Sequence, residues 1–129
     1  LQRTDDLITE AIAQSDELVV QLDFILSVLA TRNSTASKLE RELIGYLVGS
    51  LSTNMSQGAG QLQFMSNCYH RLFNHSKEQL KAGLSPQFCA EMTVGMTNVI
   101  TLNWLHDDHY DTSARFQSLQ RFLKDSMLK

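Results

Sequence analysis

The chain has 129 residues, 43% hydrophobic and 19% charged, a balance that excludes a disordered chain and suffices for one globular domain. Its formal net charge is −3 and its Lys and Arg residues are scattered, so we expect no nucleic-acid-binding surface, which requires clustered positive charge. No apolar run reaches the ~20 residues of a membrane-spanning helix, and no signal peptide is visible. The first finding predicts a chain without a membrane span, and the second fits either a mature chain or an excised domain. The location that we expect is cytoplasmic.

The first half of the chain has the periodicity of amphipathic helices. Thr4 is a candidate N-cap, and apolar residues recur at helical spacing up to Leu29, so we predict one long helix from about residue 5 to residue 30. The polar segment 31–35 should end it. A second helix should follow, with these residues on its apolar face: Leu39, Leu43, Tyr46, Leu47 and Leu51. Segment 52–60 is polar and contains glycine, which predicts a loop that could act as a gate.

The second half of the chain carries clear start and stop signals. A third helix is predicted through Leu62 to Phe73, and a capping box at Ser76 should restart the chain until Gly83 closes that piece. Ser85 and Pro86 are an N-cap and a first-turn proline for the next helix. Asp111 or Thr112 should cap the last helix.

These elements predict an all-α fold, a five- or six-helix bundle in which residues 1–129 form one domain around a single core. No strand-like alternation of useful length is present. The residues expected to be largely buried are Leu22, Ile25, Leu29, Leu43, Leu47, Leu72, Met92, Met96, Leu119 and Leu123.

The polar residues do not match a known catalytic motif. The adjacent acids Asp107 and Asp108 would diverge on a helix, which suits no shared acid–base chemistry. His106 and His109 flank these acids and form the densest set of potential metal ligands, yet polar residues also gather at solvated turns. We therefore expect no metal, no cofactor and no enzymatic activity.

Large apolar side chains are interleaved with Thr and Asn, which is the usual make-up of a small-molecule pocket. Such a pocket would hold a small, mostly apolar ligand, oriented by hydrogen bonds from Tyr69, Thr93 and Asn103. The alternative is an ordinary core whose threonines bond to carbonyls of their own helix. The expected lining residues are Met65, Tyr69, Phe88, Met92, Thr93, Met96, Asn103 and Trp104.

The last two helices are more apolar than the core of one monomer should need, and surplus apolar surface tends to mark an interface. We therefore predict a homodimer through these helices. The face assigned to the interface contains Met96, Ile100, Trp104, Phe116, Leu119, Phe122 and Leu123.

Residues 79–128 also contain a characteristic order of helix ends. The features are the turn Leu80-Lys-Ala-Gly83-Leu-Ser-Pro86, the segment Asn103-Trp104-Leu105-His-Asp-Asp108, and Tyr110-Asp111 before a helix over 113–128. In this order they resemble the C-terminal end of bacterial repressors of the tetracycline-repressor type, over about two fifths of the chain. The resemblance implies a ligand-binding and dimerisation domain of a transcription regulator. That family's N-terminal helix-turn-helix has no counterpart here, so DNA binding would lie outside this chain.

A helical sensor or protein-interaction module without a small ligand is the alternative. Three sequons, at Asn33, Asn54 and Asn74, and two cysteines would fit an extracytoplasmic receptor domain, a secreted helical protein or an adaptor. Cys68 and Cys89 fall on different predicted helices. We expect them to be free buried thiols, and a disulfide between them would favour export.

Overall fold

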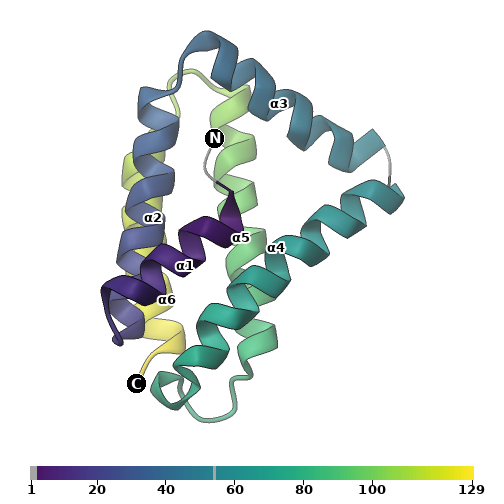
Figure 1. Cartoon of the computed structure of the whole chain (residues 1–129). Helices are drawn as coiled ribbons and strands as arrows, with labels where there is room; N and C mark the ends of the chain where they lie inside the picture. The colour runs from purple at the N-terminus through teal and green to yellow at the C-terminus, as the bar shows by residue number, and fades with distance from the viewer. Residues whose placement is uncertain (1–2, 54) are drawn as a thin grey trace.

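The structure of the chain, a computed structural model, describes residues 3–53 and 55–129, with side chains for all of these except residues 48–59. In this described part the chain forms six α-helices and one 3₁₀ turn, without a β-strand (Figure 1). The elements are α1 (Thr4–Gln14), α2 (Leu18–Thr35), α3 (Lys38–Thr53), α4 (Met55–His75), η1 (Lys77–Gln79), α5 (Pro86–His106) and α6 (Thr112–Met127). The prediction of an all-α helical bundle is confirmed.

The predicted long first helix is wrong, because the chain breaks between α1 and α2. Ser15 and Glu17 have extended backbone angles, and Ser15 Oγ accepts a hydrogen bond from the Glu17 amide at 3.0 Å. Serine and acidic side chains offer the backbone such local bonds in place of helical ones. The Gln21 amide group donates to the Ser15 carbonyl at 2.6 Å. As a result α1 crosses the bundle at an angle to α2 (Figure 1).

Both expected ends of this first helix also differ. Arg3 is the N-cap of α1, so Thr4 is its first helical residue. α2 continues through the polar segment that was expected to end it, because the hydroxyls of Ser34 and Thr35 donate to the Thr31 carbonyl at 3.1 and 2.7 Å. Hydroxyls that bond within their own helix do not interrupt it.

The start signals of the second half are confirmed. Ser85 Oγ accepts a hydrogen bond from the Phe88 amide at 3.1 Å, ahead of Pro86 in the first turn of α5. Asp111 Oδ1 accepts from the Ala114 amide at 3.0 Å and caps α6. Gly83 has a φ of +87°, which glycine adopts without strain. Ser76 is the exception, since its side chain makes no cap bond and only the short η1 follows it.

The loop predicted over 52–60 is wrong for the residues on either side of Asn54. α3 continues to Thr53 and α4 begins at Met55. One glycine costs a helix only about 1 kcal/mol, so the glycines there do not prevent helix formation. Asn54 and the side chains of 48–59 lie outside the described residues, so most side chains of the expected gate are not described.

The core lies where α1, α2, α4, α5 and α6 meet, and it includes most of the residues predicted for it. Leu22, Ile25, Leu72, Leu119 and Leu123 are buried, whereas Leu29, Met92 and Met96 are partly buried against the core. Leu43 and Leu47 are 47% and 42% exposed, so their predicted burial is wrong.

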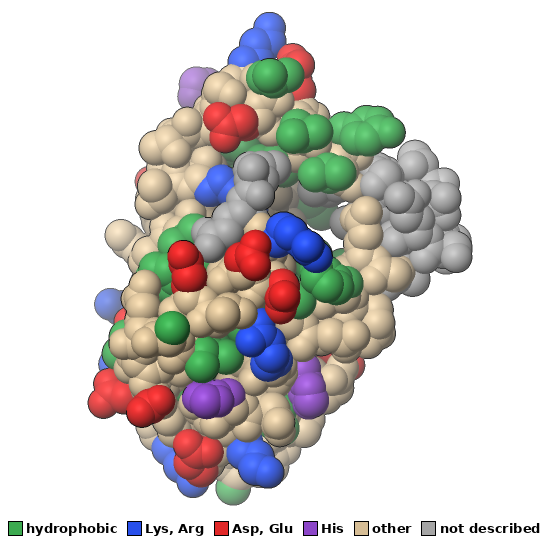
Figure 2. All heavy atoms as spheres, viewed as in Figure 1, with side chains coloured by type: hydrophobic (Ala, Val, Ile, Leu, Met, Phe, Trp, Pro, Cys, Tyr) green, Lys and Arg blue, Asp and Glu red, His purple; other side chains and the backbone are tan. Residues whose placement is uncertain are grey.

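α3 explains this difference, because its buried side is not the most apolar one. Among the described side chains of α3, which end at Leu47, Ile44 is the buried one, and the apolar face beside it points outward (Figure 2). We call this face the α3 patch. It consists of Leu39, Leu43, Tyr46 and Leu47, which are between 42% and 75% exposed. Periodicity identifies an apolar face but not what that face packs against.

The opposite end of the bundle, at the bottom of Figure 1, is held together around Gln79. Its side chain accepts a hydrogen bond from the Leu18 amide at 2.7 Å and donates one to the Asp16 carbonyl at 2.8 Å. Its own carbonyl accepts from the Lys129 amide at 3.0 Å, and Lys81 donates its amide to the Met127 carbonyl at 2.8 Å. We call this the closed end, and the end that carries α3 the open end.

Within the described residues, no helix has both the length and the apolar character to cross a membrane.

Candidate functional site

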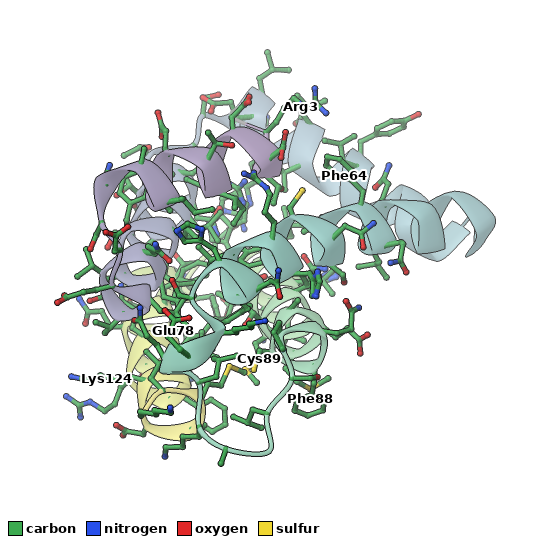
Figure 3. All side chains as sticks on the ribbon, turned by 60° about the horizontal axis from the view of Figure 1, so that its bottom comes forward. Arg3, Phe64, Glu78, Phe88, Cys89 and Lys124 are labelled. Atoms are coloured by element: carbon green, nitrogen blue, oxygen red, sulfur yellow. The ribbon has the colours of Figure 1, made fainter. Side chains whose placement is uncertain are left out.

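The residues predicted to line a pocket are placed in different environments. Tyr69 and Thr93 are 2% and 0% exposed, and Trp104 is also buried. Phe88 is 48% exposed, and Figure 3 shows its side chain pointing away from the bundle while that of the neighbouring Cys89 points inward. The remaining members are the exposed Asn103 and the partly buried Met65, Met92 and Met96.

The threonines of α5 form a buried stripe. Thr97 donates its hydroxyl to the Val94 carbonyl at 3.0 Å, and Thr101 donates to the Thr97 carbonyl at 3.1 Å. These are the own-helix bonds of an ordinary core. Thr93 differs, because its hydroxyl is buried and has no hydrogen-bond partner among the described residues.

Met65 lines a pocket between α3, α4 and the start of α1. This pocket has a volume of about 710 Å³ and also includes Leu47 and Phe64. The guanidinium carbon of Arg3 lies 5.8 Å from the centroid of the Phe64 ring, and both residues, labelled in Figure 3, line this pocket. A cation over an aromatic ring at this distance is weakly attractive.

A second cavity runs along one side of α2 and was not predicted. We call it the α2 groove. It has a volume of about 560 Å³ and is lined by Phe24, Ser27, Val28, Thr31, Arg32, Thr35 and Glu40. All of these except Glu40 lie on one side of α2, and their spacing of three and four residues was the only signal for them in the sequence.

Arg32 is the unusual member of the α2 groove. Its Nε atom is buried and has no hydrogen-bond partner among the described residues. Burial lowers the pKa of Arg32, and the nearby Tyr69 opposes this effect. Burial in turn raises the pKa of Tyr69, so its phenol is held in the neutral form. Arg32 and Tyr69 therefore lie close enough to interact electrostatically, although Tyr69 is buried and is not among the residues that line the groove.

The acidic segment at the end of α5 has structural roles. Asp107 Oδ1 accepts a hydrogen bond from the His109 amide at 2.9 Å, Asp108 pairs with Arg41 at 3.0 Å, and Asp111 caps α6. Among the described residues, no three His, Cys, Asp or Glu side chains gather closely enough to hold a metal ion. The segment shapes the turn between α5 and α6.

Cys68 and Cys89 are free and buried, and burial raises the pKa of both thiols. A raised pKa keeps a thiol protonated and unreactive. Of the predicted sequons, Asn33 is 3% exposed and could not carry a glycan in this conformation, whereas Asn74 is exposed at the end of α4. Asn54 lies outside the described residues.

The face predicted for dimerisation is mostly the core of the chain itself. Only Phe122 of that face is exposed, at 53%. Met96 is partly buried, and the buried members are Ile100, Trp104, Phe116, Leu119 and Leu123. That assignment is therefore wrong, and the free apolar surface of the last two helices lies elsewhere.

That free surface is a stripe on the outward side of α5, which we call the α5 stripe. It contains Phe88, Met92, Gly95, Val99 and Leu102, at alternating spacings of four and three residues. Phe88, Val99 and Leu102 are 48%, 56% and 39% exposed. The buried residues of α5 lie on the other side, so this helix is apolar on both sides.

Comparison of the chain with protein-family models, with curated proteins and with solved structures finds no match. The resemblance to tetracycline-repressor-type regulators therefore stays a prediction. The features that remain for a functional interpretation are the α5 stripe, the α3 patch and the two cavities.

Proposed function

We propose that this chain is the non-catalytic part of a regulatory protein, which forms a homodimer and binds a small, mostly apolar ligand. This is the role implied by the resemblance to tetracycline-repressor-type regulators. The observation that carries the proposal is that α5 is apolar on both sides while only one side is covered. A helix that is apolar all round is normally buried all round.

A second copy of the chain is the partner that fits the α5 stripe best. Apolar residues at alternating spacings of four and three are typical of a seam between two helices. In a two-fold dimer the same stripe meets itself, so its regular spacing is matched without any further partner. α6 adds one large exposed apolar side chain, Phe122.

Gly95 supports a close approach at the middle of the α5 stripe. Glycine costs about 1 kcal/mol relative to alanine inside a helix. No contact within the chain explains it, since a Cβ atom at Gly95 would meet nothing within 4 Å. A partner helix that crosses at Gly95 would explain it, because the absence of a side chain lets two backbones approach.

The dimer is tested by sedimentation of the wild-type chain and two variants. Val99→Glu places a charge in the α5 stripe, and Leu39→Glu is the matched control, because it places the same charge on a more exposed apolar residue of α3. We expect a dimer at tens of micromolar for the wild type and for Leu39→Glu, and a folded monomer for Val99→Glu. A monomeric wild type, or a dimeric Val99→Glu, would contradict the proposal.

Gly95→Ala gives a second test, because its expected effect is stabilising on a free helix surface and destabilising in a dimer interface. On a free helix surface this change stabilises the fold by up to about 1 kcal/mol. In a close helix crossing the added methyl group separates the two helices and weakens the dimer. We expect a raised dimer dissociation constant, measured by sedimentation over a concentration series. An unchanged or tighter dimer would place Gly95 outside the interface.

The ligand would bind in the cavities at the open end. The α2 groove and the pocket around Met65 have volumes within the roughly 300–1,000 Å³ of ordinary small-molecule sites. Regulation would require that the ligand bind one arrangement of the helices better than another. The free, buried thiols support the cytoplasmic location expected from the sequence.

The α3 patch favours one other function, a protein-interaction module without a small ligand. Contiguous exposed apolar residues on one helix often mark a partner-binding surface. A monomeric wild type that binds no apolar small molecule would leave this function, and Leu39→Glu and Leu43→Glu would then be the variants that abolish partner binding.

A further inference from the structure

We infer that the α2 groove binds a small apolar molecule that carries one carboxylate, and that Arg32 is the residue that holds this carboxylate. The inference rests on the proposed ligand-binding function and adds the chemical class of the ligand. It goes beyond the pocket predicted from the sequence, which included neither Arg32 nor any other residue of α2.

The α2 groove is large enough for such a molecule, and one of its walls is apolar. Its volume of about 560 Å³ lies within the range of small-molecule sites. Phe24 and Val28 are partly buried and form the apolar wall, one helical turn apart. Thr31 and Thr35 are exposed residues of the groove lining, and the Thr35 hydroxyl donates to the Thr31 carbonyl.

Arg32 lies beyond this wall and has no counter-ion. The ion pairs of the described residues join Arg41 to Asp108 and Arg71 to Asp5, and neither involves Arg32. Its Nε atom is buried without an acceptor. A buried guanidinium nitrogen without an acceptor destabilises a fold, because it has lost its water and gained no compensating bond. The Arg32 side chain as a whole is partly exposed and lines the α2 groove. An anion that enters the groove from outside the chain would supply the acceptor that this Nε atom lacks.

Glu40 is the one carboxylate among the described residues that line the α2 groove, and it already accepts a hydrogen bond. Its side chain accepts a hydrogen bond from the Ser37 amide at 3.3 Å, while Ser37 Oγ accepts one from the Glu40 amide at 3.1 Å. This reciprocal pair is a capping box at the start of α3. It holds the carboxylate of Glu40 at the rim, away from ion-pair distance of Arg32.

The charges around the α2 groove favour a carboxylate over other anions. The planar guanidinium group matches the two oxygens of a carboxylate, which it can bind through two parallel hydrogen bonds. A phosphate dianion would bring a second negative charge beside Glu40, and the described lining residues include no second cation to balance it. A monoanionic head on an apolar body therefore fits both Arg32 and the wall of Phe24 and Val28.

The test compares three probes of equal chain length by isothermal titration calorimetry with the full chain. The probes are sodium octanoate, 1-octanol and octylamine. A charge-assisted hydrogen bond in a partly buried site should make octanoate bind roughly ten- to a hundred-fold more tightly than octanol. Octylamine should bind most weakly, because its ammonium group would face Arg32.

Two variants identify the residue responsible. Arg32→Met replaces the guanidinium group with an apolar side chain, so the preference for octanoate over octanol should disappear. Arg121→Met removes an exposed arginine of α6 and is the matched control, which should keep the full preference. Arg32→Lys keeps the charge and loses the planar fork, so its preference should lie between those of the wild type and Arg32→Met.

A second measurement separates loss of the ligand contact from loss of the fold. The described residues offer Arg32 neither an ion pair nor an acceptor for its buried Nε, so Arg32→Met should melt at a higher temperature than the wild type. A lower melting temperature would mean that Arg32 is already compensated, which would overturn the inference. Equal binding of octanoate and octanol would overturn it too, while leaving the proposed apolar ligand site intact. If neither probe binds, the inference is wrong. The proposed dimer is tested separately by sedimentation of Val99→Glu.

Discussion

The closed end and the open end of the bundle are held in different ways. At the closed end, Gln79 makes three short hydrogen bonds to segments far apart in the chain, and every one of them is between neutral groups. At the open end, Arg41 joins α3 to the turn after α5 through an ion pair with the exposed Asp108. Hydrogen bonds between neutral groups are little affected by salt. An exposed ion pair is screened by salt, contributes little to stability and rearranges easily. The difference indicates that the closed end is the more rigid part, which we call the rigid frame, and that α3 is the more easily displaced one. Under the proposed function, α3 would therefore be the part that responds to the ligand.

The largest expected difference between the two ends is in the cost of removing an apolar side chain. Phe73 is fully buried, and Phe73→Ala should lower the free energy of unfolding by about 3–5 kcal/mol. Leu43→Ala, on the α3 patch, should lower it by less than about 1 kcal/mol. Chemical denaturation monitored by circular dichroism measures both. Similar losses for the two variants would mean that α3 is as tightly packed as the frame.

Gln79 gives the next largest effect. Gln79→Ala leaves the Leu18 amide and the Asp16 carbonyl without their partners at the break between α1 and α2. We expect a loss of about 2 kcal/mol, because unpaired polar groups cost more than a surface hydrogen bond contributes. Gln87→Ala is the control, since Gln87 is exposed and bonds only to Glu91 on its own helix. A loss for Gln79→Ala no greater than for Gln87→Ala would show that the break does not depend on this side chain.

Gln79 also shows which structural features could be predicted from the sequence and which could not. The caps at Ser85 and Asp111 were predictable because each cap bonds to an amide three residues along the chain. The break before α2 was not, because the group that satisfies the Leu18 amide lies 61 residues away. Local sequence patterns predict hydrogen bonds between residues that are close along the chain, but not those to a residue far away in the sequence.

The same limit applies to the candidate sites. The predicted pocket gathered the largest side chains of α4 and α5, and composition cannot separate those that face the core from those that face water. Phe88 belongs to the outward stripe, whereas Tyr69 is buried. Arg32 was passed over because an isolated arginine at a helix end is ordinarily solvated, and its burial depends on how α2 packs.

Alkaline pH should distinguish the buried Tyr69 of the core from the exposed Tyr46 of α3. Burial raises the pKa of Tyr69 above its ordinary value of about 10. Above that pH the unfolded state loses the phenol proton and the folded state keeps it, so stability should fall by up to about 1.4 kcal/mol per pH unit. Tyr69→Phe should flatten this slope in denaturation curves measured at increasing pH.

The control for this titration is Tyr46→Phe, at a position of α3 that is 75% exposed. It should leave the slope of stability against pH as it is in the wild type. The two buried cysteines add a loss of the same sign, because burial raises the pKa of both thiols, and they are present in both variants. Equal slopes for Tyr69→Phe and Tyr46→Phe would contradict the buried, neutral Tyr69.

Substitution of Arg41 should have the smallest effect on global stability, and its effect should be confined to α3. Its guanidinium carbon lies 4.8 Å from the centroid of the Trp104 ring, it donates to the Trp104 carbonyl, and it pairs with Asp108. Because Asp108 is exposed, Arg41→Met should lower the free energy of unfolding by only about 1 kcal/mol. Hydrogen exchange should nevertheless become faster at the start of α3 and stay the same in α6, since Arg41 ties only α3 to the rest.

Asp108→Asn separates the two contacts of Arg41. It removes the ion pair and leaves the guanidinium group over Trp104, so exchange at the start of α3 should rise less than in Arg41→Met. Trp104 is the sole tryptophan, so its fluorescence reports directly whether the cation has left the ring. If α3 kept its wild-type protection in both variants, packing around Ile44 rather than Arg41 would hold the open end, and α3 would belong to the rigid frame.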